Sequence, residues 1–405
     1  MTAPKLRFKE FDGDWTKYKI AEVTEYLVDG THFSPKSTDG EFKYITSKNI
    51  RNDGLDLTNI SYISKDEHES IYKRCKVQLG DILLTKDGAN TGNCCLNTLD
   101  EEFSLLSSVA VLRGKNQSFD NNFILQILQS DLGQNMIVSS MSGQAITRIT
   151  LTKLKDYSFH FPEFKEQTKI ASFLSAVDEK IAQLSQKHQL LSQYKQGMMQ
   201  KLFSQQIRFK ADDGSEFEEW ESRTLAEVGE NIIGLTYSPT DVTNDGSGIL
   251  VLRSSNIKNG RLNKNDQVRV NKKIKDKILV QPNDILICTR NGSQRLIGKS
   301  VIINDNEVMT FGAFMSVYRS QYNRFIAYLM QTPWFFEQVQ MNLGARINQI
   351  TTGTLNEFTF DFPCLEEQTK IANFLSAIDQ KIEVTAQQIE QAKQWKKGLL
   401  QQMFV

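Results

Sequence analysis

The amino-acid sequence predicts an α+β protein with two related domains, which are separated by two long helices forming an antiparallel coiled coil. The first observation is an internal repeat: EQTKIASFLSAVDEKI at 166–181 returns as EQTKIANFLSAIDQKI at 367–382, with thirteen of sixteen positions identical at an offset of 201. The second is an apolar periodicity that runs through each repeat, and the third is a set of strand-like runs upstream of each. Such a long period indicates a duplicated half instead of a solenoid unit, so we expect a pseudo-twofold axis.

The duplication divides the chain into four regions. The segments upstream of the two repeats diverge but remain alignable, and each is long enough to bury its own core. We therefore predict domains over 1–161 and 206–362, a central helical region over 162–205 and a C-terminal helical region over 363–405.

The helical regions carry apolar residues at alternating spacings of four and three, which is typical of a coiled coil. Ten such positions begin at Ile170 and end at Leu202, and the second copy begins at Ile371 and ends at Met403. If the helices pair antiparallel, Ile170 faces Met403 and the polar residue His188 faces Thr385, a central pair that would set the register. The alternative is that each helix packs on its own domain.

Within the domains the pattern favours strands, in mixed or antiparallel sheets with few helices. The strand-like runs are LRFKEF, FKYITSKNI, DILLTK, VAVLRG and YSFHFP in the first domain, and ILVLRSSNI, KILVQ, DILICTR, SVIIN, SVYR and FTFDF in the second. Helices are predicted at 121–130 and 323–331, which are matching positions.

Composition excludes several classes of protein. No run of eighteen apolar residues and no apolar N-terminal stretch exists, so neither a membrane span nor a signal peptide is expected. The five cysteines are odd in number and none is spaced Cys-x-x-Cys, which favours a reducing cytoplasm over disulfides or zinc. Net charge is zero, but between Arg253 and Lys299 twelve basic residues stand against three acidic ones, while the matching stretch of the first half balances seven against seven. A basic, strand-rich surface is typical of phosphate contact, although a solvated surface is the ordinary explanation of a charge run.

Motifs of catalysis are absent. Residues 292–300 (GSQRLIGKS) are similar to a phosphate-binding P-loop, but five residues separate the glycines instead of four, and a strand pattern follows where a helix is needed. No dinucleotide, serine-hydrolase or zinc-protease motif is present, nor the Pro-Pro-aromatic signature of amino-methyltransferases. The sequence favours a binding protein over an enzyme.

Pro-x-x-x-Glu-Gln-x-x-Ile-x-x-Phe-Leu-Ser-x-x-Asp occurs twice, each time after a diverged domain, and the chain also contains DGTHFSPK, YITSKNI, GDILLTKDG, NDILICTRNG and the ending KKGLLQQMF. Together these resemble the specificity (S) subunit of type I restriction–modification systems. The resemblance implies two target-recognition domains that each read one half of a split double-stranded DNA site. It also implies that the helical regions bind two modification (M) subunits and that restriction (R) subunits join the full complex. The partner subunit would then bind S-adenosylmethionine, and this chain would need no cofactor or metal.

Candidate base-reading residues follow from the side chains that make bidentate contacts with bases, which are Arg or Lys for guanine and Asn or Gln for adenine. In the two domains these are Lys48, Asn49, Lys86, Asn90, Gln144, Arg148, Arg253, Asn256, Arg290, Arg295, Arg346 and Gln349. Each has a phosphate contact or a solvated position as its alternative. Identity of the repeats beyond what packing requires indicates a shared partner surface, with the candidates Glu166, Gln167, Lys169, Glu367, Gln368 and Lys370, which we expect to be exposed.

Two other functions stay open from the sequence. One is a degenerate DNA methyltransferase, which would bind S-adenosylmethionine itself. The other is a stand-alone two-domain DNA-binding regulator, which would be soluble and bind DNA without M subunits.

Overall fold

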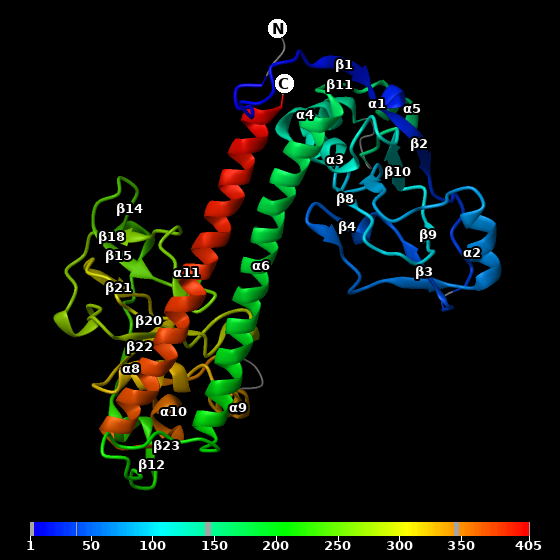
Figure 1. The fold of residues 1–405 in the computed structure, drawn as a ribbon. Coiled ribbons are helices and arrows are strands. Elements are labelled where there is room, and N and C mark those ends of the chain that lie inside the picture. The colour runs from blue at the N-terminus through cyan, green and yellow to red at the C-terminus, as the bar shows by residue number, and fades with distance from the viewer. Residues whose placement is uncertain (1–3, 38, 142–146, 344–347, 405) are drawn as a thin grey trace. The chain divides into compact units, whose positions relative to one another are not determined.

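The computed structural model describes residues 4–37, 39–141, 147–343 and 348–404, and these divide into two compact units. Unit 1 consists of Met1–Lys187 and Thr385–Val405, and unit 2 of His188–Val384 (Figure 1). Each unit contains one globular domain and half of each long helix. We call the globular parts domain 1 (residues 1–161) and domain 2 (residues 206–362).

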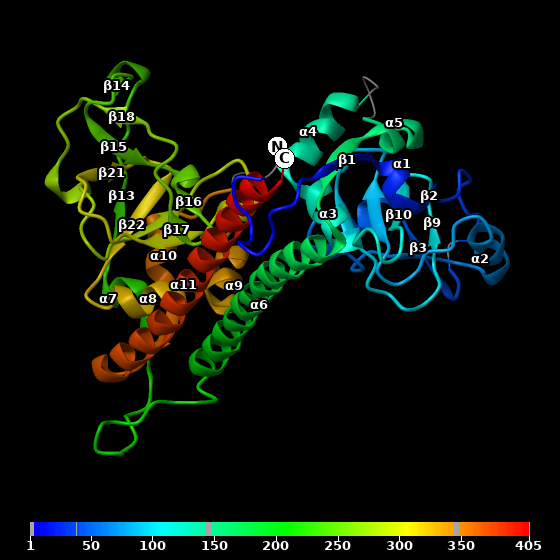
Figure 2. The same ribbon diagram turned by 45° about the horizontal axis from the view of Figure 1, so that its top comes forward.

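Domain 1 contains two larger sheets that share a buried cluster, and two two-stranded sheets. Its strands are β1 (Thr16–Lys19), β2 (Thr24–Asp29), β3 (Phe42–Ile45), β4 (Ile50–Arg51), β5 (Gly54–Leu55), β6 (Ser61–Ile63), β7 (Ile82–Thr85), β8 (Cys94–Leu96), β9 (Ser104–Leu105), β10 (Val109–Gly114) and β11 (Ser158–Phe161). Its helices are α1 (Ile20–Val23), the short 3₁₀ turn η1 (Ser47–Asn49), α2 (Lys65–Tyr72), α3 (Asn121–Gln129), α4 (Asp131–Ser140) and α5 (Leu151–Asp156). One larger sheet is antiparallel with the order β2-β10-β7-β8, and the other, β6-β3-β9, is mixed because β3 and β9 run parallel. The two-stranded sheets are β1-β11 and β4-β5. Helix α3 packs on β8 and β10 (Figures 1 and 2).

Domain 2 repeats this architecture. Its strands are β12 (Glu221–Thr224), β13 (Glu230–Ile233), β14 (Val242–Thr243), β15 (Ile249–Leu252), β16 (Ile257–Lys258), β17 (Arg261–Leu262), β18 (Arg269–Val270), β19 (Ile285–Cys288), β20 (Ser300–Ile302), β21 (Met309–Phe311), β22 (Met315–Arg319) and β23 (Thr359–Phe362). Its helices are α7 (Leu225–Val228), η2 (Pro239–Asp241), η3 (Ser254–Asn256), η4 (Asp276–Ile278), η5 (Gln294–Leu296), α8 (Asn323–Leu329), α9 (Pro333–Met341) and α10 (Thr352–Glu357). The antiparallel sheet β13-β22-β19-β20 corresponds to β2-β10-β7-β8, and β15 and β21 form a parallel pair as β3 and β9 do. The predicted α+β class with mixed and antiparallel sheets is confirmed.

The central strands explain the continuous apolar runs in the sequence. All four residues of β7 (ILLT) and of β19 (ILIC) are buried, because each strand has a neighbour on both sides and is covered on both faces. The predicted helices at 121–130 and 323–331 are α3 and α8. In α3 the carboxylate of Asp120 caps the first turn by accepting the backbone N–H of Phe123 at 3.1 Å.

Two predicted strands are wrong. The run LRFKEF forms no strand, because its backbone has no neighbouring strand to pair with and Arg7 is instead held by the long helix. The run KILVQ contains the 3₁₀ turn η4 and makes only an isolated bridge between Leu279 and Thr310. Both runs have the composition of strands, but pairing with a neighbour decides whether a strand forms.

The predicted long helices are α6 (Phe164–Phe203) and α11 (Leu365–Met403). In unit 1, Ile170 and Leu174 near the start of α6 share a buried cluster with Leu399 and Met403 near the end of α11. The reverse holds in unit 2, where residues near the end of α6 cluster with residues near the start of α11. The helices therefore pair antiparallel, as predicted. The same clusters include core residues of the adjoining domain, so each helix start also packs on its own domain.

Equivalent ion pairs lie along the helix pairing in each unit. In unit 1 Lys396 Nζ lies 2.7 Å from Asp178 Oδ1, and in unit 2 Lys195 Nζ lies 2.7 Å from Asp379 Oδ1. Asp178 and Asp379 are copies of one position, so the repeat forms the same contact twice. The predicted pairing of His188 with Thr385 falls at the division between the units and stays a prediction.

Candidate nucleic-acid interface

The structure brings several of the predicted base-reading residues together on one pair of loops in each domain. In domain 1 the segment 86–88, which follows β7, pairs with 147–149: Ile149 N–H donates to Lys86 O at 2.8 Å and Gly88 N–H to Thr147 O at 3.0 Å. In domain 2 the segment 289–291, which follows β19, pairs with 348–350: Ile350 N–H donates to Thr289 O at 2.9 Å. We call these segments the paired loops. Lys86 thus lies beside Arg148, and Arg290 lies opposite Gln349.

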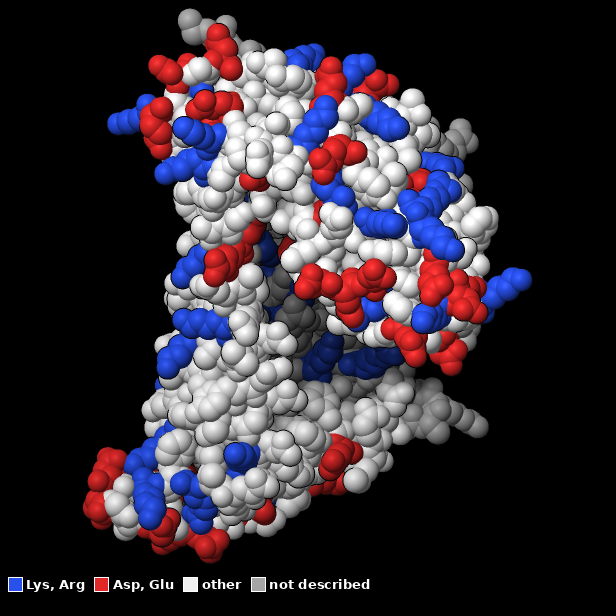
Figure 3. Space-filling model, turned by 45° about the vertical axis from the view of Figure 1, so that its right-hand side comes forward, with Lys and Arg blue, Asp and Glu red and all other residues white. Residues whose placement is uncertain are grey.

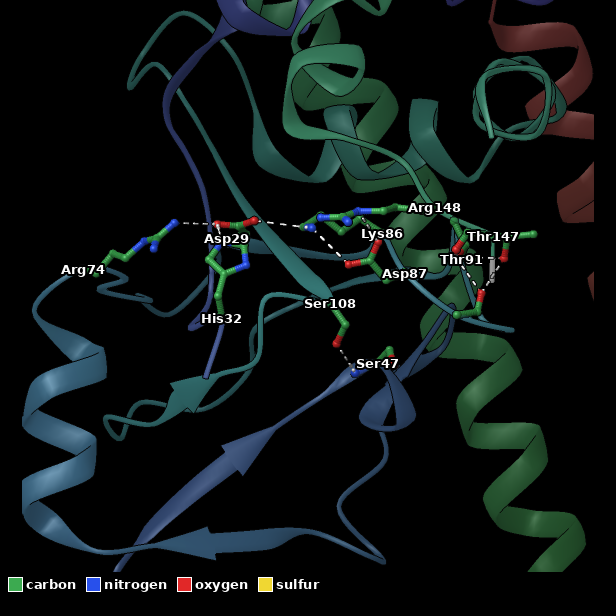
Figure 4. A network of polar contacts seen from close by, with 11 residues as sticks. Asp29, His32, Ser47, Arg74, Lys86, Asp87, Thr91, Ser108, Thr147 and Arg148 are labelled. Atoms are coloured by element: carbon green, nitrogen blue, oxygen red, sulfur yellow. Dashed lines mark hydrogen bonds and ion pairs between the residues drawn. The ribbon is translucent and has the colours of Figure 1, made fainter. Parts of the chain in front are cut away.

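A charged network holds the paired loops of domain 1 (Figure 4). Lys86 is 1% exposed, and its Nζ lies 3.1 Å from Asp87 Oδ2 and 3.4 Å from Asp29 Oδ2. Arg148 Nε lies 3.1 Å from the other oxygen of Asp87, and Arg74 approaches Asp29 at 3.2 Å. A buried cation needs such carboxylates, because an unpaired charge in the interior is strongly unfavourable. We therefore infer that Lys86 supports the loop. Because its side chain is buried, the structure does not support the prediction that Lys86 contacts DNA.

Domain 2 holds the same loops by aromatic contact instead of by charge. The guanidinium of Arg290 lies over the ring of Phe314, 4.9 Å from its centroid. Thr289, in the place of Lys86, donates its hydroxyl to the carbonyl oxygen of Phe314 at 3.1 Å. Phe314 was not predicted, although its side chain remains 58% exposed. The available signal was an aromatic residue directly after Gly-Ala in the turn between β21 and β22.

A cleft of about 790 Å³ adjoins the paired loops of domain 2. Arg253 and Arg290 line it together with Tyr237 and Phe314. Arg253 is held by Asp266, whose Oδ2 lies 2.7 Å from the arginine Nη2. Two predicted arginines and two aromatic rings therefore meet in one concave surface, which is a combination suited to nucleic-acid contact.

Asn49 and Asn256 have a different role from the one predicted. Asn49 is 4% exposed: its Oδ1 accepts from Thr46 N–H at 3.0 Å and its Nδ2 donates to Asp56 O at 2.9 Å. Asn256 is fully buried, accepts from Arg253 N–H at 2.8 Å and donates to two carbonyls at 2.8 Å. Both amides are engaged by backbone groups, so direct base contact is not supported. They hold the turns η1 and η3.

The remaining candidates lie on or beside these loops, or outside the described residues. Lys48 is exposed in η1, and Arg295 is exposed in η5. Asn90 is half-buried and donates to Ser47 O at 3.4 Å. Gln144 and Arg346 lie outside the described residues.

The basic excess of the second half is partly neutralised by carboxylates beyond the stretch. Lys264 approaches Asp305 at 2.7 Å, Arg269 approaches Glu307 at 2.6 Å, and Lys277 approaches Glu230 at 3.1 Å. Figure 3 brings the side of domain 1 forward, and on that face Lys and Arg are interspersed with Asp and Glu. The basic excess of the second half is thus partly paired, and the candidate interface is identified by the paired loops instead of by charge.

Four of the six predicted partner-binding residues are buried instead of exposed. Glu166 and Glu367 are both 0% exposed, Gln167 is 1% and Gln368 is 5% exposed. Arg7 donates to both carboxylate oxygens of Glu166, at 2.7 Å each. The expectation of exposure was wrong: arginines far upstream in the chain cover the two glutamates, and the side-chain amides of Gln167 and Gln368 donate to the carbonyl oxygens of Pro162 and Pro363.

The second unit repeats this contact. Arg208, the copy of Arg7, donates to Glu367 at 3.2 and 2.9 Å, and Trp220 Nε1 adds a bond of 3.0 Å. These pairs raise the pKa of both arginines through the hydrogen bond to the carboxylate. We call each pair an arm clasp, because it holds the segment before the first strand of the domain against the start of the long helix. Identity of the repeats thus has an intramolecular cause at these positions.

The two predicted lysines lie beside the clasps. Lys169 is exposed, 3.7 Å from Glu10 and above the ring of Phe8. Lys370 donates to Lys210 O at 2.7 Å and to Asp212 at 2.5 Å.

In the described part of the chain, no group of three or more His, Cys, Asp or Glu side chains is placed to hold a metal ion. None of the described helices combines the length and the apolar character that a membrane crossing requires.

The protein-family model "Type I restriction modification DNA specificity domain" matches this chain twice, over residues 12–193 and 217–394. The chain is 25% identical over 419 residues to the putative type I restriction enzyme MjaX specificity subunit of Methanocaldococcus jannaschii, covering 98% of this chain and 94% of that protein. It is 28% identical over 184 residues to the type I restriction enzyme EcoKI specificity subunit of Escherichia coli, covering 44% of this chain and 40% of that protein.

Solved structures share the fold. The S subunit of a type I restriction–modification system from M. genitalium superposes with a TM-score of 0.63 at 16% identity, covering 100% of this chain and 99% of that one. A chain from a structure on the assembly and conformational transition of the type I restriction–modification system gives a TM-score of 0.58 at 17% identity, covering 95% and 96%. With the family model matched in both halves, this chain belongs to the family of type I restriction–modification DNA specificity subunits.

Proposed function

We propose that the chain reads an asymmetric, bipartite double-stranded DNA target, with one half-site contacted by the paired loops of each domain. A single observation carries this proposal. The two domains share the four-stranded antiparallel sheet and the same loop pairing but present different side chains there, Asp87 with Arg148 in one and Arg290 with Gln349 in the other. One scaffold with two different reading surfaces is what recognition of two different half-sites requires.

The helical regions are proposed to bind two modification subunits, one for each copy of the repeat. The clasp residues are buried, so the docking surface must use other identical positions. Within the repeat at 166–181 and 367–382, those exposed in both copies are Thr168 with Thr369, Ala176 with Ala377, and Lys180 with Lys381. Because the same three residue types are presented at the same helical positions twice, one kind of partner is expected at both. Native mass spectrometry showing a single modification subunit per chain at saturation would contradict this.

The chain itself is proposed to be non-catalytic and to act in the cytoplasm. Adenine methylation, with base flipping and S-adenosylmethionine binding, is then the reaction of the modification subunits. Restriction subunits join in the full complex.

Methylome sequencing of cells with and without this chain, in the presence of its modification subunit, tests the proposal. We expect one bipartite motif that depends on the chain. Exchange of residues 206–362 for those of a related chain should change one half of that motif and leave the other intact. A motif altered in both halves would refute separate reading by the two domains.

The two other functions predict different results. A degenerate methyltransferase would bind S-adenosylmethionine alone, which calorimetry on the purified chain detects. A stand-alone regulator would bind its DNA target tightly without modification subunits, whereas the proposed function expects weak binding or poor solubility of the chain alone.

A further inference from the structure

The paired loops of the two domains carry their arginine on opposite segments. Asp87 and Arg290 occupy the same place after the central strand, and Arg148 and Gln349 occupy the same place on the facing segment. Each domain therefore presents one arginine at these bridge positions, but from the opposite side of the loop pair.

In domain 1 the arginine is held from one edge. Arg148 Nε forms an ion pair with Asp87 Oδ1 at 3.1 Å, and the Nζ of the buried Lys86 lies 3.1 Å from the other oxygen of Asp87. The Arg148 side chain is nevertheless 55% exposed. A guanidinium carries five N–H donors, so contact at Nε leaves the terminal amino groups available for a planar, bidentate partner.

In domain 2 the arginine is held by its face. Arg290 stacks over Phe314. Phe314 corresponds to Ser108 of domain 1, because Thr289 N–H donates to the Phe314 carbonyl and Lys86 N–H donates to the Ser108 carbonyl. Stacking uses the face of the guanidinium and leaves its in-plane donors unengaged by the ring. Both domains thus fix an exposed arginine while leaving donors free to point outward.

We propose that Arg148 and Arg290 each recognise a guanine, one in each half-site, and that Asp87 is the positioning residue that aims Arg148. The reason is geometric: the acceptors O6 and N7 of guanine match the two parallel donors of a fixed guanidinium in the major groove. This inference rests on the proposed function and adds the base class and the supporting residues. It also predicts that the two guanine-reading arginines are supported differently, by a carboxylate in domain 1 and by an aromatic ring in domain 2.

The test uses the full chain expressed with its modification subunit in cells without other adenine methylation, and reads the methylated motif. Arg148→Gln should lower the preference for one guanine of one half-site by roughly 5- to 150-fold, the ratio that corresponds to one bidentate base contact. Arg290→Gln should do the same at one guanine of the other half-site only. Asp87→Asn should relax the same position as Arg148→Gln, and Asp87→Glu, which retains the carboxylate, should restore part of the preference. Asp156→Asn, which removes an exposed ion pair with Lys19 elsewhere in domain 1, is the matched control and should leave the motif unchanged.

The outcomes separate this inference from the proposed function. If the unchanged chain directs no bipartite motif, the proposed function fails. If it does direct one, but Arg148→Gln lowers methylation equally at all sequences, Arg148 contacts phosphate and the inference is overturned. An Asp87→Asn chain with the unchanged motif, or an Asp87→Glu chain as relaxed as Asp87→Asn, overturns the positioning role.

Discussion

Removing either partner of the arm clasp in unit 1 should destabilise that unit, and by unequal amounts. The Glu166 side chain is 1% exposed, whereas that of Arg7 is 15% exposed and also donates to Gly13 O at 2.6 Å. Breaking a buried ion pair costs about 3–5 kcal/mol when a charge is left uncompensated. Arg7→Met strands the buried carboxylate and should cost about 3–5 kcal/mol. Glu166→Gln leaves a guanidinium that keeps one hydrogen bond and some water, so we expect a smaller cost of roughly 2 kcal/mol.

The double variant Arg7→Met/Glu166→Leu supplies the control for this prediction. Removing both charges and filling the space with apolar groups should return most of the lost stability, leaving a cost of about 1 kcal/mol or less. Lys19→Met, which breaks an exposed ion pair of the same domain, should have no measurable effect.

Hydrogen exchange followed by mass spectrometry is the suitable assay, since a chain of two units need not unfold in one step. Peptides from the start of α6 report on unit 1, and peptides from the start of α11 report on unit 2. Equal losses for Arg7→Met and Glu166→Gln, or a double variant as unstable as Arg7→Met alone, would refute the reasoning. A double variant with the protection of the original chain that no longer binds modification subunits would restore Glu166 as a partner contact.

Asp178→Asn and Lys396→Met should each destabilise unit 1, with a coupling energy of about 1 kcal/mol in a double-mutant cycle. Exchanging the two charged residues should recover most of the lost stability, and absence of coupling would contradict the pairing of α6 with α11. In the folded chain only the half-buried Cys364 should react readily with a thiol reagent at pH 8. Burial raises the pKa of the Cys75 and Cys95 thiols to about 12 and that of Cys288 to about 11, and it also raises the pKa of the Cys94 thiol. The same shifts should make stability fall as pH rises above about 9, since the thiols of the unfolded chain then lose protons that the folded chain retains, and a denaturation series at pH 8 and pH 10 measures this.

Much of the architecture was predictable because it depends on local patterns. The repeat at 166–181 and 367–382 revealed the duplication, and a spacing of four and three predicted α6 and α11. The continuous apolar runs of β7 and β19 identified the central strands. Each of these signals arises within a few turns or a few residues of chain, where spacing and side-chain type are sufficient evidence.

The candidate site was predictable only in part, because charge pairing joins distant segments. Arg148 and Arg290 were found from their side-chain type alone, and both are exposed on the paired loops. The burial of Lys86 was not predictable, because Asp29 reaches it through the pairing of β2, β10 and β7. The sequence also made Glu166 look like a partner contact, although Arg7 covers it from 159 residues upstream.

The sequence alone determined the duplicated α+β organisation, the two long helices, and the residue types able to read bases. The tertiary structure decided which of those residues are free to do so. A side chain's periodicity shows which face of its own element it occupies, but its exposure and its charge partners depend on which loops the sheet topology brings to it. That is why the asparagines of η1 and η3 and the lysine after β7 support the proposed reading surface, while Arg148 and Arg290 extend from it.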